Sequence, residues 1–245
     1  MPEQDLTALA NDWLQAFEKA TASSSADEAA TAVVELFEEE GYWRDLLAFT
    51  WNLTTAEGAD EIAEMIRNTW PSSIFRNVEL KGEPADEGDG VTRVHFSCES
   101  ADFKCTGIVR LRNGKAWTLL TSARELLEHP EPKGRNREMG VVHGQNEDTR
   151  NWTDRKNDRQ AALGVTEQPY TLIIGGGQGG IALGARLKRL GVPALIIDKA
   201  SRPGDQWRSR YHSLCLHDPV WYDHLPYIPF PDHWPVFTPK DKMGD

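Results

Sequence analysis

The stretch from Tyr170 to Asp198 reads YTLIIGGGQGGIALGARLKRLGVPALIID. It opens with a short apolar run typical of a buried strand, and a G-x-G-x-x-G pattern then begins at Gly175. An apolar pattern of helical period follows, and a second apolar run, residues 194–197, leads into the acid. The order strand, glycine turn, helix, strand and acid predicts a βαβ unit that binds a dinucleotide.

Each of the three spaced glycines has a physical reason in such a unit. Gly175 permits a tight turn, Gly177 has no Cβ to keep a pyrophosphate from the backbone, and Gly180 lets the helix pack close to the sheet. The helix N-terminus offers unpaired N–H groups and a partial positive charge to phosphates. Asp198, eighteen residues after Gly180, suits the ribose hydroxyls. The alternative is a glycine-rich turn without a ligand.

Composition restricts the class of protein. The formal net charge of −11 argues against nucleic acid and anionic membrane surfaces as partners. No apolar run approaches the roughly 20 residues of a membrane span, and the acidic N-terminus lacks the regions of a signal peptide. Cys98, Cys105 and Cys215 are an odd set without C-x-x-C spacing, which favours free thiols in a reducing compartment. We therefore expect a cytoplasmic protein with no metal site.

Residues 1–127 read as an α+β domain. Three helices are expected first, at residues 5–20, from Ser25 to a stop at Gly41, and at 58–70, with a strand over 46–53 between the second and third. An antiparallel meander follows. Its expected strands are 74–82, 91–98, 103–112 and 116–122, the last two joined by the hairpin signal Asn113-Gly114.

This order of elements resembles the NTF2-like (SnoaL-like) cone. In that family the interior forms a pocket or the sheet forms a dimer face, so a homodimer through the sheet is a possible partner arrangement. Candidate pocket residues are Trp43, Asp45, Trp51 and His95. The plainer interpretation is that the tryptophans are core residues and the other two are solvated.

Residues 128–169 read as a linker with a short helix at about 150–163, part of which packs on a neighbouring domain. Residues 170–245 read as an incomplete nucleotide-binding domain. After Asp198 the chain is dense in proline and aromatic residues, which predicts an extended, turn-rich segment that covers a cofactor or forms an interface.

Residues 170–245 resemble the flavin-containing monooxygenases, including the YUCCA-type and related fungal and bacterial enzymes. Four pieces carry the resemblance in order: GGGQGG at 175–180, Asp198, PGDQW at 203–207, and the pair RYHSLCLHDP at 210–219 with LPYIPFPDHWPVFTPKD at 225–241. The expected fold class is therefore an NTF2-like α+β cone followed by a partial Rossmann-type FAD-binding βαβ unit.

The resemblance implies FAD as the cofactor of this unit and NADPH as the hydride donor. It implies hydride transfer to FAD, addition of O₂ to give a C4a-hydroperoxide, and oxygenation of a small organic substrate. The residues that it assigns to FAD are Gly175, Gly177, Gln178, Gly179, Gly180, Asp198, Lys199, Gln206, Trp207, Arg208, Leu216 and His217. The catalytic residues are not assigned.

The sequence departs from the family in one respect. The second G-x-G-x-x-G for NADPH and the rest of the FAD domain have no counterpart here, so a truncated enzyme is expected. Two parallel strands and one helix cannot cover a sheet on both faces, which predicts weak or absent FAD retention and an inactive isolated chain. The alternatives are a non-catalytic NTF2-like binding or dimerisation module with a vestigial nucleotide-binding half, and an NAD-dependent dehydrogenase.

Overall fold

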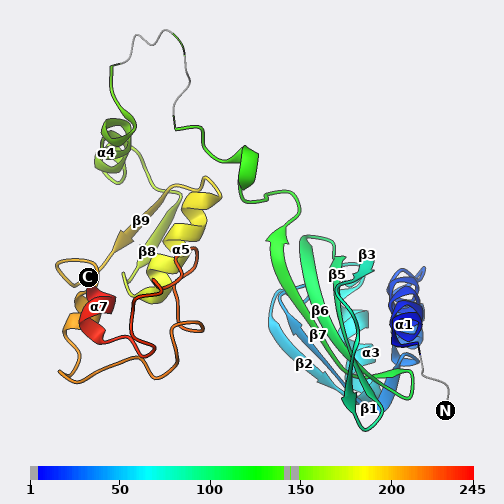
Figure 1. Cartoon of the computed structure of the whole chain (residues 1–245). Helices are drawn as coiled ribbons and strands as arrows, with labels where there is room; N and C mark the ends of the chain where they lie inside the picture. The colour runs from blue at the N-terminus through cyan, green and yellow to red at the C-terminus, as the bar shows by residue number, and fades with distance from the viewer. Residues whose placement is uncertain (1–4, 141–143, 145–148) are drawn as a thin grey trace. The chain divides into compact units, whose positions relative to one another are not determined.

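The computed structural model describes residues 5–140, 144 and 149–245, and it divides into two compact units, Met1–Pro130 and Glu131–Asp245 (Figure 1). The expected first domain, residues 1–127, lies within the first unit. Parts of the expected linker, residues 141–143 and 145–148, lie outside the described residues.

The helices of the first unit are α1 (Leu6–Thr21), α2 (Ala26–Val34) and α3 (Gly58–Thr69). The Asp5 carboxylate accepts hydrogen bonds from the N–H groups of Thr7 and Ala8 and so begins α1. Ser25 caps α2 by accepting from the Glu28 N–H at 3.3 Å. The expected helices 5–20 and 58–70 are confirmed, but the second helix ends before the predicted stop at Gly41.

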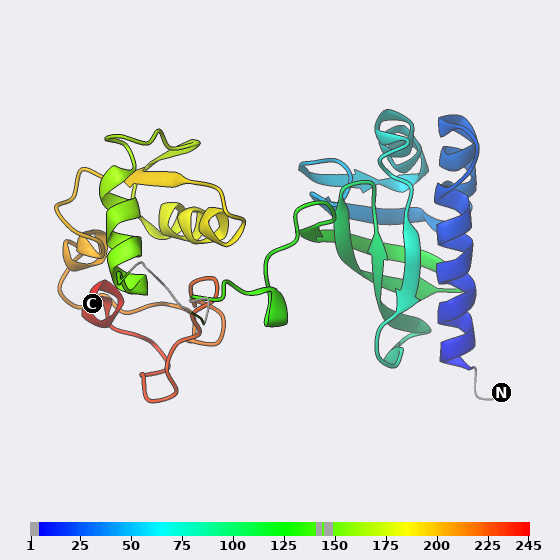
Figure 2. The same ribbon diagram turned by 90° about the horizontal axis from the view of Figure 1, so that it is seen from above.

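The strands of the first unit form one mixed sheet in the order β2-β1-β7-β6-β5-β3, with β4 also paired to β5. Only the pairing of β1 with β7 is parallel among these described strands. The strand bounds are β1 Phe37–Leu46, β2 Leu53–Glu57, β3 Arg76–Leu80, β4 Ala85–Gly88, β5 Val91–Glu99, β6 Phe103–Arg112 and β7 Lys115–Leu126. Figures 1 and 2 show the sheet curving beside α1 and α3. The α+β class and the predicted meander are confirmed.

Two expectations near β1 are wrong, and both have a local cause. Residues 37–41 belong to a strand, with an irregular register between Phe37 and Tyr42 where the strand pairs with β7. Residues 47–52 are a loop, not a strand, because the Asp45 carboxylate accepts hydrogen bonds from the N–H groups of Phe49 (3.3 Å) and Thr50 (3.1 Å) and draws the chain into a turn.

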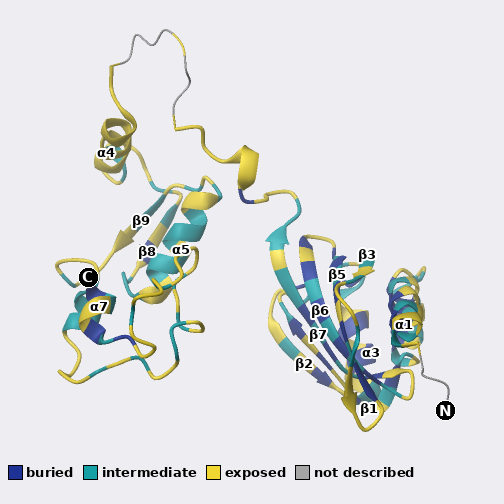
Figure 3. Ribbon diagram, in the orientation of Figure 1, coloured by how far each residue is buried: buried dark blue, intermediate teal, exposed yellow. Residues whose placement is uncertain are grey.

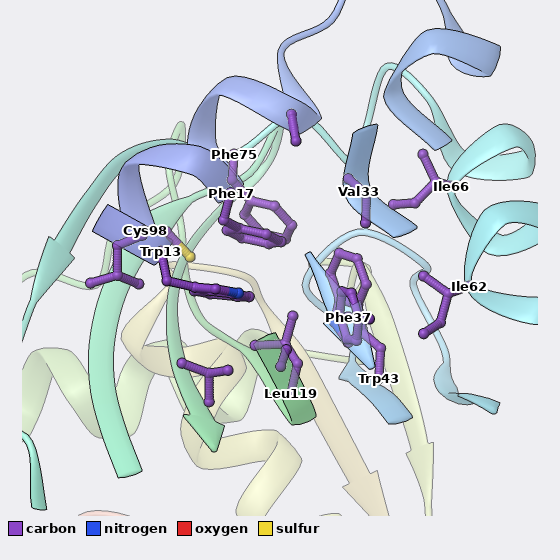
Figure 4. Close-up of a cluster of buried hydrophobic side chains, with 14 of the residues drawn as sticks. Trp13, Phe17, Val33, Phe37, Trp43, Ile62, Ile66, Phe75, Cys98 and Leu119 are labelled. Carbon is purple, nitrogen blue, oxygen red and sulfur yellow. The ribbon is translucent and has the colours of Figure 1, made fainter. Parts of the chain in front are cut away.

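Aromatic rings fill the interior of the first unit (Figure 4). Phe17 lies at the centre of the cluster, with its ring centroid 5.1 Å from that of Trp13, 5.3 Å from Phe75 and 5.5 Å from Trp43. Such pairs stabilise a core beyond the apolar area that they bury. The interior of this sheet is therefore a packed core.

The four candidate pocket residues of this unit do not meet in one place. Trp43 is buried in the core and His95 is exposed, as the plainer interpretation has it, whereas Trp51 is 60% exposed and its interpretation as a core residue is wrong. Asp45 is buried, so its interpretation as a solvated residue is wrong. Its carboxylate accepts four hydrogen bonds, from Thr121 Oγ1 at 2.6 Å, from Thr50 Oγ1 at 2.7 Å and from the two loop N–H groups. The network is satisfied internally and orders the loop.

The second unit contains the predicted βαβ arrangement. Strands β8 (Thr171–Ile174) and β9 (Ala194–Ile197) are parallel and in register, and α5 (Gln178–Arg189) connects them. The remaining helices are η1 Gly134–Asn136, α4 Trp152–Ala162, α6 Asp205–Arg208 and α7 Lys240–Gly244. Of the strand side chains, Ile173 is buried whereas Ile174 is 83% exposed. The expectation that this small sheet is not covered on both faces is confirmed (Figure 3).

The segment after Asp198 is extended and rich in turns, as predicted. Its two halves run side by side, because the Leu216 N–H donates to Thr238 O and the Val220 N–H donates to Val236 O, both at 2.9 Å. The expected linker packs on this unit through Glu131, which is buried and contacts Arg186 of α5. By contrast, α4 is mostly exposed, and Trp152 at its start is 49% exposed.

Candidate functional site

The glycine loop between β8 and α5 has a geometry that larger residues would disrupt. Gly175 has φ +110°, a backbone conformation that side-chain-bearing residues rarely adopt. A Cβ at Gly180 would lie 1.8 Å from the Gly175 carbonyl oxygen, which is a backbone atom that cannot swing aside. The close approach of helix and strand predicted for Gly180 is thus present.

The backbone N–H groups at the N-terminus of α5 are hydrogen-bond donors at the end of this loop. The helix begins at Gln178 after Gly177, which provides no side-chain cap. The first N–H groups of an α-helix have no acceptor within the helix, so this end presents donors and a partial positive charge. A Cβ at Gly177 would lie 2.4 Å from Gln206 Oε1. The bare backbone of Gly177 is therefore covered by the end of an exposed, flexible side chain.

Asp198 follows β9 and turns its carboxylate toward the same loop. Oδ2 accepts a hydrogen bond from the Gly176 N–H at 2.6 Å, and Oδ1 accepts one from the Ala200 N–H at 2.7 Å. The N–H groups of Ala200 and then Gly176 lower the pKa of Asp198 below its ordinary value. The acid is thus ionised and fixed beside the glycine loop, as its sequence position predicts.

A hollow of about 320 Å³ adjoins the N-terminus of α5. Four of the residues predicted to contact a cofactor line it together, namely Gln178, Gly179, Trp207 and Leu216. Ligand pockets generally run from about 300 to 1,000 Å³. The volume of the hollow thus lies at the lower end of this range.

The rest of the hollow's lining was not predicted from the sequence. The remaining lining residues are Ala182, Tyr222, Asp223, His224, Leu225, Pro226 and Met243. The aromatic and proline density of the segment indicated a covering role, but no pattern pointed to individual positions. Met243 comes from α7, whose approach to α6 is a tertiary contact without a local signal.

Three predicted cofactor residues lie elsewhere. His217 and Lys199 are exposed, and neither lines the hollow among the described residues. Arg208 turns away from it: its guanidinium donates to Asp205 Oδ1 at 3.1 Å and to the Gly244 carbonyl of α7. Ion pairing and helix capping thus hold the Arg208 side chain against α7, and its assignment to the flavin side stays a prediction.

The sequence of this region matches a known family. Residues 173–237 match the family described as NAD(P)-binding Rossmann-like domain. This agrees with the order of β8, α5 and β9 and with the loop geometry between them.

Curated relatives match the same part of the chain. Indole-3-pyruvate monooxygenase YUCCA1 of rice is 37% identical over 76 residues, which is 31% of this chain and 19% of the relative. A CzcO-like oxidoreductase of Geobacillus kaustophilus is 38% identical over 74 residues, 30% of this chain and 21% of the relative. The matched region thus spans about a fifth of each relative's length, and the resemblance to the YUCCA-type group is confirmed for this region.

Solved structures similar to this chain cover about half of it. A ketosteroid isomerase-like protein from Erwinia carotovora has 16% identity and a TM-score of 0.36, covering 50% of this chain and 98% of that one. An NTF2-like protein from Cytophaga hutchinsonii has 12% identity and a TM-score of 0.33, covering 51% and 95%. In the part of the chain that the structure describes, no helix is long and apolar enough to cross a membrane.

Proposed function

We propose that residues 170–245 contribute an FAD site and that the protein belongs to an NADPH-dependent system that oxygenates a small organic molecule. One observation carries the proposal: a single hollow brings Gln178 and Gly179 of the glycine motif next to Trp207 and Leu216. These residues come from three separate sequence segments that resemble flavin-containing monooxygenases. The YUCCA relatives, named as monooxygenases, support the same reaction class.

The residues present fit such a cofactor. The N-terminus of α5 suits a pyrophosphate, and the Asp198 carboxylate suits ribose hydroxyls. Gly177 leaves the space that a phosphate needs, and the Gln206 side chain that occupies it is exposed and free to turn out. The hollow beside them suits a flat ring. FAD, when bound, supplies the redox chemistry, and NADPH is the hydride donor that the resemblance implies.

The roles proposed for the chain are binding, orientation and exclusion of water. The backbone of α5 holds negative charge, Asp198 fixes the ribose, and Trp207 and Leu216 cover one face of a ring. A cytosolic setting is part of the proposal and is supported by the three unpaired cysteines. Since the β8–β9 sheet is open, we expect weak FAD retention by this chain.

Titration of FAD with the purified chain, followed by flavin fluorescence, tests the proposal. We expect saturable, weak binding that Asp198→Ala weakens about tenfold or more, because hydrogen bonds to a charged group contribute about 1.5–3 kcal/mol. Asp218→Ala, at an exposed aspartate of the same unit, is the matched control and should leave the Kd unchanged. Absence of saturable binding, or an equal Kd for Asp198→Ala, would contradict the FAD site. A stoichiometric yellow protein would contradict only the weak retention.

The first unit supports a second candidate function, a binding or dimerisation module. It has its own aromatic core, and the face of its sheet away from that core is not uniformly polar. Ile108 of β6 and Leu120 of β7 are directly paired there, and neither is fully exposed. Light scattering coupled to gel filtration tests homodimerisation through this face. Ile108→Lys should convert a dimer to a monomer, whereas a monomeric wild type would contradict dimerisation through this face.

A further inference from the structure

The turn from Leu225 to Ile228 forms part of the hollow's wall and has an unusual residue at its third position. The Ile228 N–H donates to the Leu225 carbonyl at 3.3 Å, Pro226 is second, and Tyr227 is third with φ +70°. This is the pattern of a type II turn, whose third position ordinarily holds glycine or asparagine. Leu225 and Pro226 both line the hollow.

A tyrosine with positive φ is disfavoured, because its Cβ crowds the backbone. Such residues persist where surrounding contacts hold them. Tyr227 has three contacts: its hydroxyl donates to Glu131 Oε1, Arg186 Nη1 donates to the hydroxyl at 3.1 Å, and the Arg189 guanidinium lies 4.6 Å from the ring centroid. The side chain thus stabilises a backbone conformation that a tyrosine would not adopt by itself.

Glu131 is the central acceptor of this group. Its side chain is only 1% exposed, and Oε1 also accepts from Arg186 Nη1 at 2.6 Å. It lies 96 residues before Tyr227 in the sequence, ahead of the whole βαβ unit. Its other oxygen, Oε2, is buried and has no hydrogen-bond partner in the described part of the chain. Burial of an unpartnered carboxylate oxygen costs stability, and the charge-assisted hydrogen bonds at Oε1 are the contacts that offset this cost.

Helix α5 connects this group to the hollow. Gln178, Ala182, Arg186 and Arg189 recur at spacings of four, four and three, so they lie along one side of the helix. The first two line the hollow, and the last two contact Tyr227. One rigid element therefore carries one wall of the hollow and the arginines that hold the turn of the opposite wall.

We propose that Glu131 is a positioning residue for the hollow: by holding Tyr227 it fixes the Leu225–Ile228 turn at a set distance from α5. The inference rests on the proposed function only in treating the hollow as the place of a cofactor ring. It assigns a role in the nucleotide-binding unit to a residue of the segment that precedes this unit. Without Glu131 the turn loses its main anchor while β8, α5 and β9 stay folded.

Hydrogen exchange measured by mass spectrometry on the whole chain, without any cofactor, tests this role. Glu131→Ala and Tyr227→Phe should each speed exchange of peptides covering residues 220–228 about tenfold, the loss expected for a hydrogen bond to a charged group. Peptides covering residues 171–190 should change little. The double variant should be no faster than either single one, since both remove the same contact. Glu131→Gln, which keeps an acceptor oxygen, should restore part of the protection, and Glu138→Ala, an exposed glutamate of the same segment, should have no effect.

The Tyr227→Gly variant distinguishes an effect of the Tyr227 side-chain contacts from an effect of the positive φ alone. Glycine adopts positive φ without cost, so if φ alone shaped the turn, this variant would exchange as slowly as the wild type or more slowly. We expect faster exchange, and unchanged or slower exchange would overturn the proposal. Equal acceleration over residues 171–190 in Glu131→Ala would also overturn it, since Glu131 would then only stabilise the unit. Failure of FAD to bind the wild type bears on the proposed function alone.

Discussion

Lys240 and Arg208 each cap the helix that carries the other. Lys240 Nζ, at the start of α7, donates to the carbonyl of Arg208 at the end of α6, at 3.0 Å. The Arg208 guanidinium in turn donates to the carbonyl of Gly244 at the end of α7. Cations at helix C-termini satisfy the last carbonyls and the negative end of the helix dipole. Both helices are too short to be stable by themselves. Each is capped by a side chain of the other, and these two contacts stabilise α6 and α7 as a pair.

Lys240→Ala should therefore loosen α6 and α7 together. Lys240 is buried, and its removal leaves the Arg208 carbonyl without its donor, at an expected local cost of about 1–3 kcal/mol. Hydrogen exchange of residues 204–209 and 240–245 measures the effect. Lys188→Ala, at an exposed lysine of α5, is the control. Loosening of α6 without α7 would show that the caps act independently.

Gly107→Ala should destabilise the first unit. Gly107 of β6 is paired with Phe96 of β5, and a Cβ there would lie 2.1 Å from the Phe96 ring. Overpacking of this kind costs about 1–3 kcal/mol in unfolding free energy. Urea denaturation followed by tryptophan fluorescence measures the loss. If the Phe96 ring causes this loss, Gly107→Ala should lower the unfolding free energy less in a Phe96→Leu background than in the wild-type chain.

Asp45→Ala should cost more than a surface substitution. It removes an acceptor of four hydrogen bonds in a buried position and leaves the Phe49 and Thr50 N–H groups without partners. We expect a loss of about 2–4 kcal/mol in unfolding free energy. Asp12→Ala, at an exposed aspartate of α1, should change it by less than about 0.5 kcal/mol. Equal effects of the two would contradict a structural network at Asp45.

Acid should release the Asp198 carboxylate from the glycine loop. Its pKa in the folded chain is below the ordinary value of 3.8, chiefly because the Ala200 and Gly176 N–H groups donate to the ionised form. The contact is thus fully present above pH 3.8 and is lost as the pH falls through the lower, folded-state pKa. Carboxyl ¹³C NMR should give that pKa, and the Gly176 amide shift should titrate with it. A midpoint at or above the ordinary value would contradict these hydrogen bonds.

Local patterns predicted much of the fold, and tertiary contacts explain most of the errors. Strand β6 and helix α3 were predicted at nearly their observed bounds because alternation and helical period are strong in them. The sequence from Phe37 to Leu46 was misassigned in part because its acidic run hides the alternation of β1, and because parallel pairing with β7 is a distant contact. The loop after Asp45 was unpredictable for the same reason, since its shape depends on a buried carboxylate.

In the candidate site, too, the features set by local sequence could be predicted and those set by tertiary contacts could not. The geometry of the glycine loop and the position of Asp198 beside it could be predicted, because a local turn and a fixed spacing determine them. Tyr222 and Met243 were missed because the hollow is closed by segments whose approach depends on side-chain contacts far apart in the sequence. The direction of the Arg208 side chain was not predictable, because a long, charged side chain turns toward whichever partners the fold brings near it, here Asp205 and the end of α7.

The small sheet of β8 and β9, which is not covered on both faces, affects how the protein aggregates in solution. The outer strands of the first unit's sheet carry charges, such as Glu57 on β2 and Arg76 and Glu79 on β3, which discourage pairing with another chain. The strands TLII and ALII of the second unit carry none, and Leu172 and Ile197 are exposed. Short, uncharged, apolar strands with free main-chain donors and acceptors are templates for self-association. Aggregation of this protein at high concentration should therefore begin in the second unit, by strand addition, while the aromatic core of the first unit remains folded.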